Sequence, residues 1–328
     1  MDTMYFFPQK NKDIKSNPYS INYLKALSHY FEIVNENEVL NHGFRFALLK
    51  NSTIADIYVL NWIEAISSGM KGFVLFLYSL LAIIIILVRN KKIIWMFHNI
   101  HPHEGENIYS RVIQKILFRK SALIITHSKE AEKYVKTKTD VCVLYRPHPI
   151  KRFLPEQLVF DGNVKYCDVF IWGGIFPYKG VAEFLSNPQI QKMNLKIRIV
   201  GTCVDSELDK RIKKLTNSNV VYENRRASFG EIAKQVCLSK YVLFPYVGNS
   251  ISSSGALIDT LVFGGTPVGP DKGAFKDLEE EGVCITYKNE EDLASILRST
   301  PQKLKVEKFI SDNTWEKFAR VIWEFFQD

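Results

Sequence analysis

The sequence predicts an α/β protein with two doubly wound, Rossmann-like domains. Short apolar runs rich in β-branched and aromatic residues alternate with helical patterns along the chain, which is typical of a parallel sheet covered by helices. With 328 residues, the chain is long enough to form two such cores. Hydrophobic and charged contents of 46% and 24% are those of a globular protein. Five widely spaced cysteines, without a Cys-x-x-Cys pair, favour a reduced, cytoplasmic protein.

Six short apolar runs in the N-terminal half are predicted to be strands. Asn17 and Tyr19 lie between the first run and a helix expected over 20–30, and we predict a polar loop there. Prolines at 147 and 149, followed by a polar stretch over 154–166, indicate a connection between domains. We therefore expect domains at 1–155 and 156–312. The predicted strands are 5–7, 32–34, 56–60, 93–97, 123–126 and 141–144.

Residues 73–88 form an apolar run without charge, and basic residues follow it directly. We predict one helix of the N-terminal domain, because the run is shorter than the roughly 20 residues that span a bilayer. A helix that is apolar nearly all round either is buried or dips into a membrane surface. A true span is the third alternative.

The segment 111–152 is strongly basic, and the whole chain carries a formal charge of +8. No recognisable nucleic-acid module accompanies these charges, so we do not expect nucleic acid as a partner. An anionic cytoplasmic membrane surface is the better partner for this segment. An ordinary solvated surface is the alternative interpretation.

A glycine turn in the C-terminal half is the most informative feature of the chain. The apolar run 169–172 leads into Gly173 and Gly174, and Lys179 and Gly180 precede the next helix. Glycines allow backbone N–H groups to approach a ligand closely, and the N-terminus of a helix favours negative charge. Lys179 adds a positive charge that can reach a phosphate. A phosphate-bearing ligand is the expected partner of this turn.

The following strands bring more polar residues to the same edge of the predicted sheet. Ligands of doubly wound sheets bind outside the carboxyl ends of the strands. Those ends carry glycines, arginines and a serine loop, a set that suits a nucleotide sugar. The expected donor-binding residues are Gly173, Gly174, Lys179, Gly201, Arg225, Arg226, Tyr246, Ser252, Ser253, Ser254 and Gly255.

This order of motifs resembles the C-terminal half of GT-B glycosyltransferases. It is similar to the bacterial retaining enzymes that build polysaccharides, those like glycosyltransferase family 4. The likeness continues through residues 95–104 and 125–128. It implies two Rossmann-like domains that face each other across a cleft, with a helix over 313–328 that returns to the N-terminal domain.

The resemblance also implies an activity. The chain is expected to be a hexosyltransferase that moves a sugar from a nucleotide sugar to a lipid-linked oligosaccharide or polysaccharide acceptor. Such an enzyme would act in cell-surface polysaccharide or capsule biosynthesis, in the cytoplasm and peripherally on the inner face of the membrane. No cofactor or metal is expected, because no Asp-x-Asp motif lies in a plausible loop.

Two residues are candidates for catalysis. His98 ends the predicted strand 93–97, and in similar enzymes a histidine after this strand lies beside the donor sugar, where its ring could donate a hydrogen bond. Glu104 lies in the loop beyond it and could act as the base for the acceptor hydroxyl. The resemblance implies acceptor contacts for Asn17 and Tyr19. His98, His101 and His103 are too close together for a usual zinc site.

The chain departs from the family pattern at positions where many relatives carry two glutamates. Ser252 and Thr260 stand there, and Gly174 replaces a common arginine. Retention is the leading expectation. An inverting enzyme with Glu104 as base, and a non-catalytic GT-B-like module that binds a membrane, are the alternatives.

Overall fold

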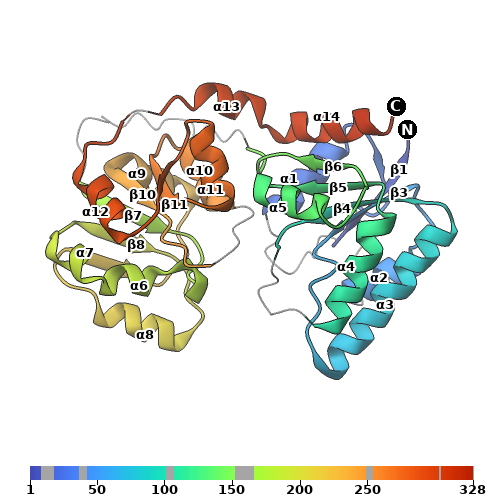
Figure 1. Ribbon diagram of the computed structural model, residues 1–328, viewed down its shortest axis with the longest axis horizontal. Coiled ribbons are helices and arrows are strands. Elements are labelled where there is room, and N and C mark those ends of the chain that lie inside the picture. Colours follow the sequence, from blue (N-terminus) through green and yellow to red (C-terminus); the bar gives the residue numbers. More distant parts are fainter. Residues whose placement is uncertain are drawn as a thin grey trace. The chain divides into compact units, whose positions relative to one another are not determined.

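The computed structural model describes residues 1–8, 18–36, 43–100, 107–151, 166–248, 254–302 and 304–327. The chain divides into two compact units. Unit 1 comprises Met1–Pro149 with Asn313–Asp328, and unit 2 comprises Ile150–Asp312. Each unit holds a six-stranded parallel sheet with helices on both faces (Figure 1). The predicted class of two doubly wound, Rossmann-like domains is confirmed.

The sheet of unit 1 has the strand order β2-β1-β3-β4-β5-β6. All of its strand pairs are parallel, so their carboxyl ends lie at one edge. The strands are β1 (Thr3–Phe7), β2 (Glu32–Ile33), β3 (Ile57–Asn61), β4 (Lys92–Phe97), β5 (Leu123–Thr126) and β6 (Val143–Tyr145), and the helices are α1 (Pro18–Leu27), α2 (Phe44–Lys50), α3 (Gly69–Val88), α4 (Ile108–Lys120), α5 (Lys129–Lys136) and α14 (Trp315–Phe325).

Alternating residues of the unit 1 strands bury their side chains on opposite faces of the sheet. In β4, Trp95 and Phe97 pack with α2, α3, α4 and α5, whereas Ile94 and Met96 pack with α1 and α14. Because both faces are covered, the strand is apolar throughout, as is usual for parallel sheets. The last helix of the chain, α14, is therefore part of the core of unit 1.

Helix α3 begins at Gly69, four residues before the apolar run, and ends at Val88. It packs against α2 and α4 on one flank of unit 1 (Figure 1). A buried arginine on α2 fixes this packing: Arg45 donates to Ser79 Oγ of α3 at 2.7 Å and to the carbonyl of Ile63 at 2.6 Å. Within the described part of the chain, α3 alone is long and apolar enough to cross a membrane.

The sheet of unit 2 has the order β12-β11-β10-β7-β8-β9 and is again entirely parallel. Its strands are β7 (Cys167–Trp172), β8 (Ile197–Val200), β9 (Val220–Glu223), β10 (Ser239–Leu243), β11 (Pro267–Pro270) and β12 (Ile285–Tyr287). Its helices are η1 (Pro177–Lys179, 3₁₀), α6 (Val181–Ser186), α7 (Pro188–Lys192), α8 (Ser206–Lys214), α9 (Phe229–Leu238), α10 (Gly255–Val262), α11 (Gly273–Glu280), α12 (Glu290–Arg298) and α13 (Glu307–Asp312).

The central strand β7 shows how unit 2 positions its turns. Val169 and Ile171 pack with α6, α7, α8 and α12, while Phe170 and Trp172 pack with α9, α10, α11 and α13. Because both faces of the strand are packed, the position of its carboxyl end at Trp172 is fixed. The glycine turn at 173–174 follows at the carboxyl edge, where a ligand of such a sheet is expected.

Candidate active site

The glycine turn, a lysine and the start of a helix meet in unit 2. Gly173 has a φ of +99°, a conformation that residues with a side chain rarely adopt. A Cβ at this position would lie 3.7 Å from Lys179 Nζ and 3.8 Å from Ala256 Cβ of α10. Gly173, Lys179 and the start of α10 thus surround one point at the carboxyl end of β7.

Lys179 is a half-buried ammonium group in an aromatic setting. Its Nζ lies 5.3 Å from the ring centroid of Tyr246. Burial lowers the pKa of Lys179, and nearby Tyr178 opposes this shift. Within the described ranges, no Asp or Glu forms an ion pair with this lysine. A positive charge that burial disfavours and no carboxylate offsets is a ready partner for an anion.

The start of α10 adds further polar groups to this point. Ser254 caps the helix, with its Oγ accepting from the N–H of Leu257 at 3.4 Å. The hydroxyl of Tyr246 lies 3.2 Å from the same Oγ. The first turn of α10 contains no acidic residue, so the partial positive charge of its N-terminus is not offset within the turn. The structure thus brings together Gly173, Lys179, Tyr246, Ser254 and Gly255 from the predicted donor-binding set.

Two predicted glycines have packing reasons for being glycine. A Cβ on Gly201 would come within 1.9 Å of the carbonyl oxygen of Gly173, so the turns after β7 and β8 can touch only if residue 201 has no side chain. A Cβ on Gly174 would come within 2.8 Å of the Phe176 ring. Both glycines shape the edge of the sheet, whether or not they also contact a ligand.

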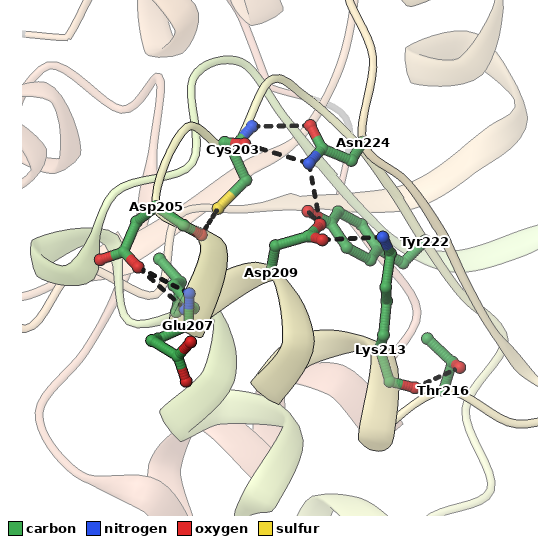
Figure 2. Close-up of polar contacts among 9 residues, drawn as sticks. Cys203, Asp205, Glu207, Asp209, Lys213, Thr216, Tyr222 and Asn224 are labelled. Atoms are coloured by element: carbon green, nitrogen blue, oxygen red, sulfur yellow. Dashed lines mark hydrogen bonds and ion pairs between the residues drawn. The ribbon is translucent and has the colours of Figure 1, made fainter.

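A polar network holds the loops after β8 and β9 (Figure 2). The side chain of Asn224 accepts from the N–H of Cys203 at 2.9 Å and donates to its carbonyl at 3.0 Å. Asp209 of α8 accepts from Asn224 at 2.8 Å and from Tyr222 at 2.9 Å, and pairs with Lys213 at 2.7 Å. These contacts lock the backbone next to Gly201.

The two predicted arginines differ in their surroundings. Arg225 pairs with Glu223 at 2.7 Å and bonds both carboxylate oxygens of Glu231. Its charge is therefore compensated within the protein, which does not favour a role on a phosphate. Arg226 is exposed, and its side chain forms no ion pair with the described residues. Ser252 and Ser253 lie outside the described residues.

Residue 260, where many relatives carry the second of the two glutamates, is not accessible to a ligand. Thr260 is fully buried, accepts from the indole N–H of Trp172 at 3.1 Å and donates to the carbonyl of Ala256 at 2.8 Å. Its hydroxyl is used by the core of unit 2. On the same helix, burial raises the pKa of the Asp259 carboxyl to about 6, against the influence of Lys151.

In unit 1, His98 follows β4 and is buried. Its ring stacks on Trp62 with centroids 4.2 Å apart, and its Nε2 lies 3.3 Å from Asn61 Oδ1. The Nδ2 of Asn61 donates to the carbonyl of Phe7 at 2.7 Å, so its oxygen faces the histidine. Nε2 therefore carries the proton, and Nδ1 keeps a lone pair.

His98 is a neutral hydrogen-bond acceptor in this setting. Burial lowers its pKa well below the ordinary value, and the neighbouring His127 and His148 add to the effect. In this tautomer Nδ1 accepts a hydrogen bond from a hydroxyl. The expected donation to a sugar hydroxyl would need the other tautomer, which Asn61 disfavours.

Trp62, whose ring stacks on His98, has a strained backbone. Its φ of +51° is unusual for a residue with a large side chain, and such strain persists only where the surroundings enforce it. Asn61 and Trp62 were not among the site residues predicted from the sequence. The available signal was a polar residue, Asn61, at the carboxyl end of a buried strand that neighbours β4.

The expected loop around Tyr19 is wrong. Helix α1 begins at Pro18, a favoured first helical position for proline, so Tyr19 lies in its first turn. Tyr19 is buried, and its hydroxyl is 2.8 Å from Nε2 of His127. Its ring contacts His98 and Trp315 with centroids 5.3 Å and 5.1 Å away. In this position Tyr19 packs the site around His98, and an acceptor contact stays a prediction.

His127 is likewise satisfied inside unit 1. Its Nδ1 donates to the carbonyl of Arg146 at 2.8 Å, which leaves Nε2 to accept from Tyr19. The next residue, Ser128, caps α5, with its side chain accepting from the N–H of Ala131. Asn17, His101, His103 and Glu104 lie outside the described residues. Among those that are described, no group of three or more His, Cys, Asp or Glu is placed to hold a metal ion.

Known structures share this fold. No protein-family model and no curated protein sequence matches the chain. The chain is similar over its whole length to AviGT4, a glycosyltransferase of avilamycin A biosynthesis, with 12% identity, 97% of that chain covered and a TM-score of 0.64. It is also similar to the lipopolysaccharide outer core galactosyltransferase WaaB, with 11% identity, full coverage of both chains and a TM-score of 0.62.

A third similar structure is a UDP-forming α,α-trehalose-phosphate synthase from Burkholderia vietnamiensis. The identity is 8%, the alignment covers 100% of this chain and 94% of the synthase, and the TM-score is 0.61. At such identities the likeness establishes the fold. The two Rossmann-like units are those of the GT-B glycosyltransferase fold, and the resemblance stated from the sequence is confirmed at this level.

Proposed function

We propose that the chain is a glycosyltransferase that moves a hexose from a nucleotide sugar to an acceptor hydroxyl. The observation that carries the proposal is Lys179. Its half-buried ammonium has no carboxylate partner among the described residues and lies between the Gly173 turn and the start of α10. A diphosphate would supply the missing negative charge.

Each group then has a role that follows from its chemistry. Lys179 and the N-terminus of α10 bind the donor diphosphate and stabilise the charge that develops on it as the sugar leaves. The neutral His98 accepts a hydrogen bond from a sugar hydroxyl through Nδ1. We expect binding without a metal, with these groups supplying the positive charge.

Retention is the proposed stereochemical course. The bond between the anomeric carbon and the phosphate oxygen breaks, and the acceptor oxygen bonds that carbon on the same face. The leaving phosphate oxygen takes the proton of the acceptor hydroxyl, while Lys179 stabilises the charge of the diphosphate. An inverting course with Glu104 as base is the second candidate. The observation that favours it is Thr260, which bonds Trp172 where many retaining relatives have a glutamate.

We propose a lipid-linked oligosaccharide or polysaccharide acceptor, in cell-surface or capsular polysaccharide biosynthesis. One structure of similar fold is a galactosyltransferase of the lipopolysaccharide outer core. A peripheral site on the cytoplasmic face of the membrane suits such an acceptor.

A thermal-shift screen of nucleoside diphosphates and their sugars tests the proposal. At 100 times Kd a ligand adds about 2.7 kcal/mol to the free energy of unfolding, so a true donor raises the melting temperature clearly. We expect stabilisation by at least one nucleoside diphosphate and by its sugar conjugate. If no member of a panel with all common bases and hexoses stabilises the chain, the proposal is refuted.

A further inference from the structure

Helix α3 presents an apolar face outward from unit 1. The residues of this face recur every three or four positions, so they lie along one side of the helix. Met70 and Val88, near its two ends, are 78% and 75% exposed. The outward face of α3 is Met70, Phe73, Leu77, Leu81, Ile84 and Val88.

The opposite side of α3 is fixed in the core. Gly72, Ser79, Ala82, Ile83 and Ile86 are buried. The helix is therefore apolar on both sides, whereas a surface helix of a soluble protein normally has a polar outer side. A continuous exposed apolar strip that runs along a helix about 30 Å long is the kind of patch that marks a protein or membrane interaction site.

The helices that form and flank this strip carry charges of one sign. Helices α2, α3 and α4 contain Lys and Arg but no Asp or Glu. On α4, which packs against α3, Arg111, Lys115 and Arg119 recur every four residues and are exposed. Lys115 and Arg119 form no ion pair with other described residues. Arg89 follows the end of α3 and is also exposed.

Because α3 is packed against unit 1 along its length, a surface can contact only its outward face and must run parallel to the helix axis. Arg45 joins α2 to Ser79 in the middle of α3, and β4 begins at Lys92, only four positions after Val88. Strand β4 pairs with both β3 and β5 in the centre of the sheet. A crossing of the bilayer by α3 would pull its buried side out of this core.

We propose that the outward face of α3 and the basic side of α4 dock the chain onto an anionic lipid bilayer, with α3 lying in the plane of the interface. The apolar side chains enter the boundary of the acyl chains, and the lysines and arginines meet the lipid phosphates. A second copy of this chain fits less well, because a symmetric contact between two such faces would bring like charges together. The proposal is independent of the glycosyltransferase activity.

Vesicle flotation of the full chain, without any nucleotide sugar, tests the docking. We expect binding to vesicles of phosphatidylglycerol and phosphatidylcholine, weak binding to phosphatidylcholine alone, and loss of affinity as salt rises. The double variant Leu81→Ser/Ile84→Ser should bind at least about 10-fold more weakly, because two apolar side chains leave the interface. The matched control is Tyr166→Ser/Val221→Ser in unit 2, two exposed apolar residues whose loss should leave binding unchanged.

A second pair of variants tests the charges and remains informative if the serine variant does not fold. Lys115→Gln/Arg119→Gln removes two exposed charges and should weaken binding to anionic vesicles about 25-fold at low salt, from about fivefold per charge. Lys192→Gln/Lys214→Gln on unit 2 is the control for net charge. Equal binding by both charge variants would refute the docking surface.

Light scattering separates the bilayer from a second copy. If the chain is a stable dimer that Leu81→Ser/Ile84→Ser converts to a monomer, and anionic vesicles do not bind the wild type, then the outward face of α3 is a protein interface and the proposal is wrong. A monomer in solution that floats with anionic vesicles supports it.

Discussion

Replacing Lys179 by methionine removes the charge on which the proposed donor site depends and keeps the length of the side chain. A charged hydrogen bond contributes about 1.5–3 kcal/mol, so the variant should bind a nucleoside diphosphate about 10- to 150-fold more weakly. Folding should change little. The lost contact with the Tyr246 ring, about 0.5–2 kcal/mol, is offset because an ammonium that burial disfavours is no longer buried.

Isothermal titration of the wild type and Lys179→Met with the diphosphates of uridine, guanosine and adenosine measures this effect. Lys192→Met on α7, an exposed lysine of the same unit, is the matched control and should bind as the wild type does. The affinity of the wild type should also fall as the pH rises through the lowered pKa of Lys179, because only the ammonium form attracts phosphate. Wild-type affinity in Lys179→Met for every diphosphate that binds would refute the phosphate site.

Three further predictions concern unit 1. His98→Ala should lower turnover by about 100-fold or more while changing donor affinity less, if His98 acts mainly on the transition state; equal losses in steady-state turnover and in the titrated affinity would contradict this. Glu104→Gln should cost about 100- to 10,000-fold in rate for an inverting enzyme and much less for a retaining one, so full activity in a single-turnover assay excludes Glu104 as the base. The stability of unit 1 should fall as the pH drops from about 6.5 towards 4, because burial lowers the pKa of His127 to about 3 and that of His148 to about 4, so the unfolded chain binds more protons. At pH 5, protonation of His127 in the unfolded chain lowers the free energy of unfolding by about 1–2 kcal/mol. His127→Gln should therefore flatten the pH dependence of the melting temperature, and an equally steep profile in that variant would contradict the explanation.

The sequence was sufficient to predict the fold because parallel strands covered on both faces leave a strong pattern. Each predicted strand is present within a few residues, since runs such as 93–97 are apolar without interruption and turn residues bound them. Gly173, Lys179 and Ser254 were predictable as a group because they follow strands that end at one edge. These residues meet at one point because of how α10 packs, and the spacing of apolar residues in the sequence does not predict that packing.

Other properties of the site depend on contacts between distant residues. The tautomer of His98 is set by Asn61, whose amide is in turn oriented by the carbonyl of Phe7. The charge of Arg225 is offset by Glu223 and Glu231. No local sequence pattern predicts such partners, so the sequence placed Arg225 in the donor-binding set without showing that its charge is paired. The start of α1 at Pro18 was predictable from the preference of proline for the first helical turn.

The most direct test of the proposed activity is the product of a transfer reaction. The wild-type chain is incubated with anionic vesicles that carry a lipid-linked oligosaccharide fraction and with each nucleotide sugar that stabilises the chain. The release of nucleoside diphosphate and the anomeric proton of the new linkage are then followed by NMR. We predict stoichiometric release of nucleoside diphosphate and a linkage with the same anomeric configuration as the donor, both lost in Lys179→Met. A new linkage of opposite configuration would contradict retention, and donor binding without any release of nucleoside diphosphate would contradict the proposed transferase activity.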